Sequence, residues 1–200
     1  MLQTETKSIS FTEFVEWKPD GRNYELHDGV IIEMQPKGKH EEIIGFLNTE
    51  FTLQFRLLKL PYLIPKQVLV KVLDRETCYS PDVLVLNRNN LTNEPLWEKC
   101  STVQDSNSIP LTVEVVSSNW RDDYLSKVRD YEEIGICEYW IVDYLGLGGI
   151  RYIGNPKQPT ISIYHLIDRE YQVTQFKDND LIVSPTFPEL QLTVAQILNC

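Results

Sequence analysis

Basic residues are few in this chain relative to acidic ones, with 19 Lys and Arg against 29 Asp and Glu and a formal net charge of −10. Such a balance argues against a protein that grips nucleic acid over a broad surface, because Lys and Arg make most contacts to phosphate. A local basic groove can still coexist with an acidic total, since carboxylates that bind a metal ion add negative charge where the ion sits.

Long apolar segments and paired cysteines are also missing. No apolar run approaches the roughly 20 residues that span a bilayer, and the N-terminal MLQTETKSIS lacks the basic and apolar parts of a secretory signal. No CxxC pair occurs, which disfavours a zinc knuckle and predicts free thiols in a reducing cytoplasm. The G-x-G-x-x-G pattern is absent too, which leaves little support for a nucleotide-dependent oxidoreductase.

The length and the apolar pattern predict one domain over residues 1–200, with an α+β fold built on a mixed sheet. The predicted helices cover 10–17, 40–60, 122–134 and 193–200. The predicted strands cover 24–34, as a hairpin that turns at Asp28-Gly29, and 68–72, 82–86, 111–116, 138–142, 150–153, 161–166 and 171–176. Residues 87–110 are predicted to form a long polar loop, of a kind that is often functional.

Two acidic residues in predicted strands carry the chemistry. Asp82 follows Pro81 at the point where an apolar strand begins, and Glu114 lies inside the apolar strand LTVEVV. A carboxylate in such a strand is costly unless it is paired, hydrogen-bonded or bound to metal. Turn formation by Asp82 and a salt bridge to Glu114 are the alternatives. Together the two acids predict a hard oxygen site suited to Mg²⁺ or Mn²⁺.

The order and spacing of five segments resemble the Uma2 (DUF820) family of endonucleases, within the PD-(D/E)xK superfamily. The segments are YELHDGVIIEM, SPDVLVL, LTVEVVS, DYLSKVRDYEEIGICEYWIVD and LIVSPTFPELQLTVAQIL. The resemblance implies a restriction-endonuclease-like core with flanking helices and extra β-hairpins, and metal-dependent cleavage of DNA. It also implies that Asp82, Glu114 and the backbone carbonyl of Val115 hold the metal.

The superfamily's lysine, two residues after the second acid, is replaced here by Val116. Lys127 is the predicted substitute, because it lies roughly 8 Å into the next helix and helical side chains lean back toward the N-terminus. There it could stabilise charge that develops on the phosphate. The alternative is a surface ion pair with Asp123, four residues earlier. Lys71 is a weaker candidate for the same role.

Other residues could complete the site. Glu25, in the first strand of the hairpin, would add an oxygen if that strand flanks the site. His40 opens the long helix and resembles the family's histidine at that place; the alternative is a solvated or structural histidine at a helix start. Tyr124 and Tyr131, which flank Lys127 at steps of three and four, are predicted to be packing residues with hydroxyl groups that could contact phosphate.

The predicted activity is hydrolysis of DNA by a metal-dependent endonuclease with Asp82, Glu114 and Lys127 at its centre. A homodimer is compatible with this activity, because symmetric pairs are the commonest oligomer. Two alternatives stay open. Val116 and the acidic charge favour a degenerate binding module of the same fold, and a metal-dependent phosphodiesterase could act on a substrate other than DNA.

Overall fold

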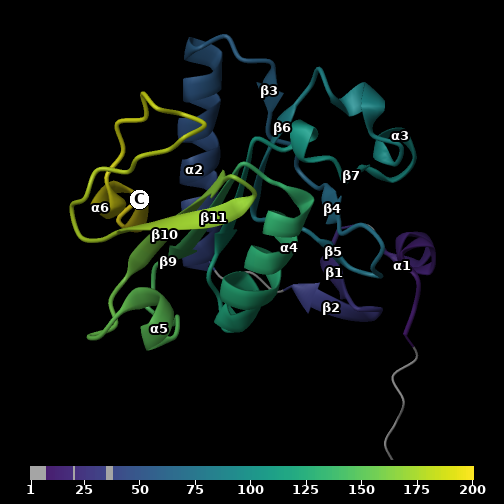
Figure 1. The fold of residues 1–200 in the computed structure, drawn as a ribbon, viewed down its shortest axis with the longest axis horizontal. Helices are drawn as coiled ribbons and strands as arrows, with labels where there is room; N and C mark the ends of the chain where they lie inside the picture. The colour runs from purple at the N-terminus through teal and green to yellow at the C-terminus, as the bar shows by residue number, and fades with distance from the viewer. Residues whose placement is uncertain (1–7, 20, 35–37) are drawn as a thin grey trace, which may run out of the picture.

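The computed structural model describes residues 8–19, 21–34 and 38–200, which form two β-sheets with helices packed around them (Figure 1). The larger sheet has the order β11-β10-β9-β8-β6-β3 and the smaller one the order β2-β1-β5-β4-β7. The larger sheet comprises β3 (Tyr62–Leu63), β6 (Val83–Asn87), β8 (Leu111–Val115), β9 (Glu138–Asp143), β10 (Thr160–Ile167) and β11 (Glu170–Phe176). The smaller sheet comprises β1 (Asn23–His27), β2 (Val30–Met34), β4 (Leu69–Lys71), β5 (Cys78–Tyr79) and β7 (Thr102–Val103).

Both sheets are mixed, which confirms the predicted α+β fold. Strands β8 and β9 run parallel, whereas β6 pairs with β8 in the antiparallel sense. In the smaller sheet, β4 and β7 are parallel and the other pairs are antiparallel. The predicted hairpin is present as β1 and β2, and its turn residues Asp28 and Gly29 have φ values of 47° and 81°. These positive values are the ones that a tight two-residue hairpin turn requires, and Asp-Gly tolerates them well.

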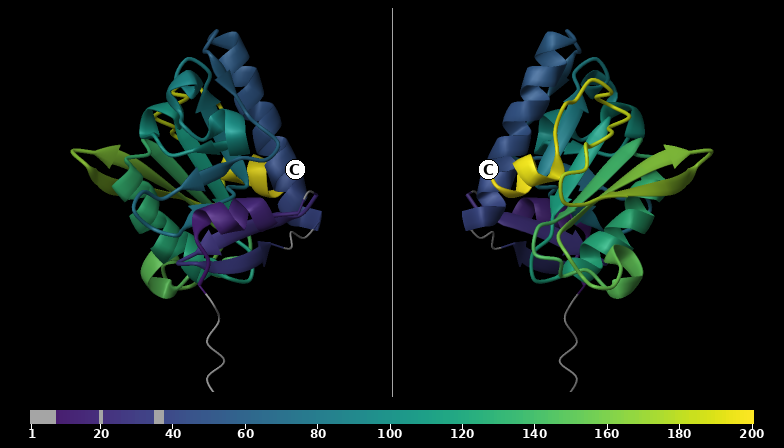
Figure 2. Two further views of the ribbon diagram at one scale, coloured as in Figure 1. Left: turned by 90° about the vertical axis from the view of Figure 1, so that its right-hand side faces the viewer. Right: turned by 90° about the vertical axis from the view of Figure 1, so that its left-hand side faces the viewer.

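The helices are α1 (Phe11–Trp17), α2 (Gly38–Leu57), α3 (Trp97–Cys100), α4 (Lys127–Ile134), α5 (Ile150–Ile153) and α6 (Val194–Leu198). Helix α2 runs along one side of the molecule, and the β10–β11 hairpin projects from the other (Figure 2). A π-helical turn, η3 (Asp122–Ser126), leads directly into α4. None of the helices in the described ranges combines the length and the apolar character needed to cross a membrane.

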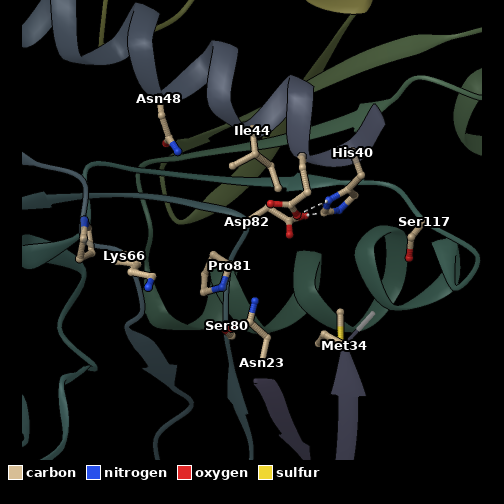
Figure 3. Close-up of a pocket in the computed structure, with 12 residues that line it drawn as sticks. Asn23, Met34, His40, Ile44, Asn48, Lys66, Ser80, Pro81, Asp82 and Ser117 are labelled. Atoms are coloured by element: carbon tan, nitrogen blue, oxygen red, sulfur yellow. Dashed lines mark ion pairs between the residues drawn. The ribbon is translucent and has the colours of Figure 1, made fainter. Parts of the chain in front are cut away.

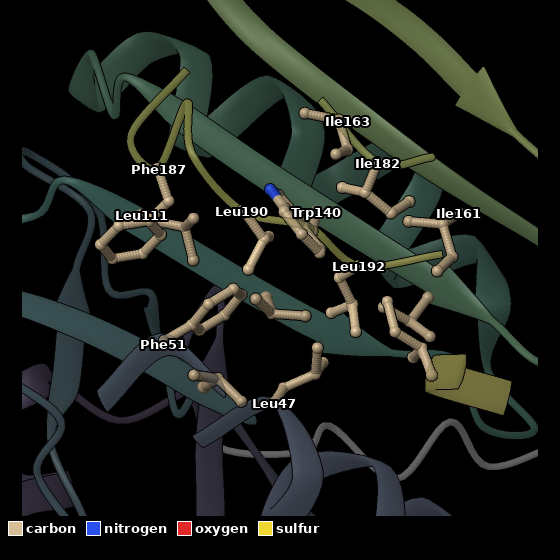
Figure 4. Packing of buried hydrophobic residues seen from close by; sticks show 14 of the residues in the cluster. Leu47, Phe51, Leu111, Trp140, Ile161, Ile163, Ile182, Phe187, Leu190 and Leu192 are labelled. Atoms are coloured by element: carbon tan, nitrogen blue, oxygen red, sulfur yellow. The ribbon is translucent and has the colours of Figure 1, made fainter. Parts of the chain in front are cut away.

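Each face of the larger sheet is covered by a separate apolar cluster. On one face, α2 and the C-terminal segment pack against the sheet, where Phe51 meets Trp140 and Phe187 with ring centroids 5.3 Å apart in both cases (Figure 4). On the opposite face, residues of α4 and of the smaller sheet cover Leu84 and Ile141. Burial on both faces explains why β6 and β8 read as continuous apolar runs in the sequence.

Two parts of the chain differ from the sequence prediction. Residues 150–153 form the helical turn α5 rather than a strand, because Gly149 and Gly154 bound a run too short to pair and Ile153 alone turns into the core. The segment 87–110 is not a structureless loop. It contains α3, β7 and two 3₁₀ turns, η1 (Leu91–Asn93) and η2 (Ser106–Ser108).

Candidate active site

Strands β6 and β8 bring Asp82 and Glu114 together. Their antiparallel ladder ends at the pair Val83–Val113, and Asp82 and Glu114 are the next residues along each strand. The amide of Val115 donates a 2.7 Å hydrogen bond to Asp82 Oδ2, which fixes this carboxylate at the end of the ladder. The predicted position of Asp82 at the start of a strand is therefore confirmed.

The alternation of side chains along β8 decides which way Glu114 points. Leu111, Val113 and Val115 belong to the cluster under α2. Because successive side chains of a strand point to opposite faces, Glu114 lies on the face covered by α4. There the hydroxyl of Tyr131 donates a 2.8 Å hydrogen bond to Glu114 Oε1.

Lys127 reaches the same place from the first turn of α4. Its Nζ lies 3.0 Å from Oε1 of Glu25, 3.0 Å from Oε2 of Glu114 and 3.6 Å from Oδ1 of Asp123. The side chain is 1% exposed, so the alternative of a surface pair with Asp123 is wrong, although the pair itself exists. We call Glu25, Asp82, Glu114, Asp123 and Lys127 the central cluster.

The π-helical turn before α4 sets this geometry. The amide of Lys127 donates to the carbonyl of Asp122, five residues earlier, instead of four as in an α-helix. Such single-turn insertions rotate the residues that follow relative to those before and occur frequently at functional sites. Here the turn places Asp123 and Lys127 on the buried side together.

Strand β1 of the hairpin flanks the central cluster, which is the condition under which Glu25 is expected to contribute an oxygen. Glu25 is 1% exposed, and its Oε1 also accepts a 3.1 Å hydrogen bond from the amide of Ser80. Its Oε2 lies 2.8 Å from Nε2 of His27. Burial raises the pKa of Glu25, but the charges of Lys127 and His27 outweigh that effect and the pKa is lowered overall.

His40, at the start of α2, faces Asp82 across a pocket. Its Nε2 lies 3.2 Å from Asp82 Oδ2, and the two side chains point toward each other in Figure 3. Burial lowers the pKa of His40, but the hydrogen bond and charge of Asp82, with those of Glu41, raise it overall. His40 is 6% exposed, so it is not a solvated helix-start histidine.

The central cluster holds more negative than positive charge. Burial, followed by the charges of Asp82 and Glu25, raises the pKa of Glu114 well above its ordinary value although Lys127 lowers it. The same causes raise the pKa of Asp123 to about 7. Burial alone would lower the pKa of Lys127, but the surrounding carboxylates raise it further, so the lysine stays charged.

The donor set is compatible with a divalent cation. Within the described ranges, no three His, Cys, Asp or Glu side chains are grouped closely enough to hold a metal ion as they stand. Mg²⁺, however, usually binds through one or two carboxylates and keeps several waters. Asp82 and Glu114 provide such a pair, and a cation would offset both the burial and the neighbouring carboxylate charges that raise the pKa of Glu114. The chemistry of Asp82 and Glu114 is therefore suited to a divalent cation.

The structure separates the remaining sequence candidates. Lys71 does not reach the central cluster, because its Nζ donates to the carbonyls of Val72 and Arg75. Tyr124 packs between the rings of Trp120 and Tyr152.

Three partners were missed as site residues. The sequence assigns Tyr131 to packing, offers Asp123 only as an alternative surface partner of Lys127, and assigns no role to His27. Spacing could have indicated all three, because Asp123 and Tyr131 lie four residues from Lys127 and His27 lies two residues from Glu25 on one strand.

Comparisons with known proteins agree with this architecture. Residues 11–195 match the family model Uma2, described as "Putative restriction endonuclease". A crystal structure described as "a putative nuclease belonging to DUF820", from Anabaena variabilis ATCC 29413, is similar with a TM-score of 0.72 at 17% sequence identity. The match covers 96% of this chain and 98% of that chain. No curated protein matches the sequence. The predicted restriction-endonuclease-like fold is thereby confirmed.

Proposed function

Because the chain belongs to the Uma2 family, we propose that it is a metal-dependent endonuclease that hydrolyses DNA phosphodiester bonds through a single domain spanning residues 1–200. The observation that carries the proposal is the buried ammonium of Lys127, 3.0 Å from both Glu25 and Glu114 and next to Asp82. Phosphodiester hydrolysis needs carboxylates that can hold a metal ion and a positive charge that can stabilise the developing negative charge.

In this proposal, Asp82 and Glu114 hold Mg²⁺ or Mn²⁺, and the backbone carbonyl of Val115 completes the protein's share of the ligands. When bound, the ion lowers the pKa of a water molecule and polarises a phosphoryl oxygen.

The other residues of the site act on charge and position. Lys127 stabilises the negative charge that develops on the phosphate. Tyr131 orients Glu114 through its hydroxyl, and His40 orients Asp82. Glu25 keeps Lys127 charged and in place, since its own pKa is lowered by that neighbour. Val116 takes the place of the lysine of the usual spacing, and its side chain is fully buried in the apolar cluster under α4.

Incubation of purified protein with supercoiled plasmid and single-stranded DNA tests the proposal, in Mg²⁺, in Mn²⁺ and in EDTA. We expect cleavage with either ion, none in EDTA, and none with Glu114→Gln or Asp82→Asn. Lys59→Gln, which changes an exposed lysine at the far end of α2, is the matched control and should cleave normally. Cleavage by both acid variants at the wild-type rate would remove the assignment. A homodimer, which could cut both strands of a duplex, is tested on the same sample by light scattering.

A second candidate is a binding module that has lost catalysis. The ammonium of Lys127 already sits between the carboxylates, which favours this reading because a lysine can substitute for a metal ion as their counter-charge. Calorimetric titration with Mn²⁺ separates the two candidates. Binding that disappears in Asp82→Asn supports the nuclease, whereas no binding together with no cleavage supports the module.

A further inference from the structure

Three pockets lie in a row along the edge where the central cluster meets the smaller sheet. The middle pocket is the one that His40 and Asp82 line. It shares Asn23 and Ser80 with a second pocket that extends toward α3. On its other side it shares Met34 and Ser117 with a third pocket, which Lys127 lines. The three pockets therefore adjoin one another along the candidate active site, and together we call them the groove.

Apart from Lys127, which is buried among carboxylates, the basic residues that line these pockets lie in the middle pocket and in the pocket toward α3. Lys66 lines the middle pocket opposite His40 (Figure 3), and Lys18 and Lys99 line the pocket toward α3. Lys66 and Lys99 are exposed. Among the residues that the structure describes, no carboxylate lies within ion-pair distance of any of these three ammonium groups. Unpaired lysines in a groove are available to an anionic ligand.

The opposite arm has the reverse character. The third pocket is lined by Glu33, Asp122 and Asp123, and its one basic residue is Lys127, which is already surrounded by carboxylates. A chain of phosphates would therefore be attracted along the lysine arm and repelled along the acidic arm.

We propose that Lys66, Lys18 and Lys99 bind the DNA backbone on one side of the bond to be cleaved, so that the protein holds its substrate asymmetrically. The inference rests on the proposed function for the identity of the ligand, and it adds the surface that carries the substrate. Phosphate contacts of this kind position a nucleic acid without reading its sequence. The groove thus aligns the DNA backbone with the candidate active site. Because only a few lysines make these contacts, an acidic protein can bind DNA in this way.

Fluorescence anisotropy of a labelled duplex and a labelled single strand, titrated with protein in EDTA at several salt concentrations, measures binding apart from cleavage. Lys66→Gln, Lys99→Gln and Lys18→Gln are each compared with Lys59→Gln, which has the same change in net charge. Lys59 lies beyond the C-terminal end of α2, about 25 Å along that helix from His40. For each groove variant we expect a dissociation constant raised several-fold and a salt slope smaller by about 0.9 for duplex or about 0.7 for single-stranded DNA.

Each outcome decides the proposal separately from the nuclease assignment. Groove variants that bind DNA as Lys59→Gln does would overturn the groove, even if the wild-type protein cleaves plasmid. Absence of DNA binding by the wild-type protein at low salt would overturn it as well. Weakened binding by the groove variants supports it, including the case in which no cleavage is found and the nuclease assignment fails. If both stand, the variants should raise KM for cleavage more than they lower kcat.

Discussion

Replacing Lys127 with methionine removes one positive charge from the centre of the cluster while nearly keeping the volume of the side chain. Lys127 is 1% exposed and lies 3.0 Å from the carboxylates of both Glu25 and Glu114. Methionine fills the same space, so packing should change little. What changes is that two buried carboxylates lose their counter-ion. The substitution therefore measures the electrostatic contribution of the lysine to stability.

The size of the effect follows from the distances. At an effective dielectric constant of roughly 20, a pair 3.0 Å apart attracts by about 6 kcal/mol. Most of that attraction is offset by the cost of removing the charges from water, and breaking a buried pair by deleting one partner costs about 3–5 kcal/mol. Whole domains are stable by only about 5–15 kcal/mol. We expect Lys127→Met to lower the free energy of unfolding by about 3–5 kcal/mol at pH 8.

Acid should restore part of this loss. Without Lys127, the folded-state pKa of Glu25 would rise above its unfolded value, and that of Glu114, which is already raised, would rise further. The variant therefore loses stability as pH rises through those values. At pH 5 the carboxylates can bind protons, and the difference from wild type should shrink. The double variant Lys127→Met, Glu114→Gln should also recover stability, because it removes one of the uncompensated charges.

Urea denaturation followed by tryptophan fluorescence, to which the buried Trp140 contributes, gives the measurement. Lys59→Met is the control for loss of an exposed lysine. An unfolding midpoint and slope for Lys127→Met equal to those of the control at pH 8 would refute the electrostatic reasoning, because the charge would then contribute nothing at the cluster.

Three further predictions concern the neighbours of Lys127. Glu114→Gln should abolish cleavage yet leave the free energy of unfolding equal or higher, because the raised pKa of Glu114 shows that its charge is unfavourable in the fold. A drop of more than about 2 kcal/mol in the free energy of unfolding, measured with denaturant, would contradict this. Tyr131→Phe should cost about 2 kcal/mol and lower kcat with little change in KM, and steady-state kinetics that show a change in KM alone would argue against its positioning role. The pKa of Asp123 is raised to about 7 in the folded state. The free energy of unfolding of the metal-free protein should therefore fall between pH 4 and pH 8, because the protonated form of Asp123 that the fold favours is lost as pH rises. Asp123→Asn should flatten that profile in melts across the range, and an unaltered profile would exclude Asp123 as its source.

Features that depend on neighbouring residues could be read from the sequence. The turn at Asp28-Gly29 appears as predicted. The helix predicted from residue 10 begins with a capping box of Ser10 and Glu13, and the helix predicted to end at residue 134 is closed by the left-handed Gly135. Each is specified by the conformational preferences of a few adjacent residues. The same holds for Asp82, because Pro81 marks the start of its strand whatever the strand later pairs with.

Features that depend on packing between helices and strands could not be predicted from the sequence. Whether Lys127 is exposed or buried depends on how α4 sits on β8, which the period of a helix does not determine. The π-helical turn at Asp122–Ser126 has no signal in residue preferences, yet it sets the side to which Asp123 points. The strand predicted for residues 150–153 is wrong for a related reason. Isoleucine and tyrosine favour strands in general, but the flanking glycines and the burial of Ile153 decide in favour of a helical turn.

The net charge of −10 does not show where the charged residues lie in the fold. As a total it argues against nucleic-acid binding, because affinity depends on the number of phosphates that Lys and Arg neutralise. In the fold, the central cluster gathers four carboxylates around Lys127, whereas Lys18, Lys66 and Lys99 make no ion pair with a carboxylate of the described residues. A phosphate is therefore repelled by the cluster unless a cation is present, and attracted only along the lysine arm. An acidic protein of this design would bind DNA weakly and with a small salt slope, and would depend on divalent ions for productive binding at the site.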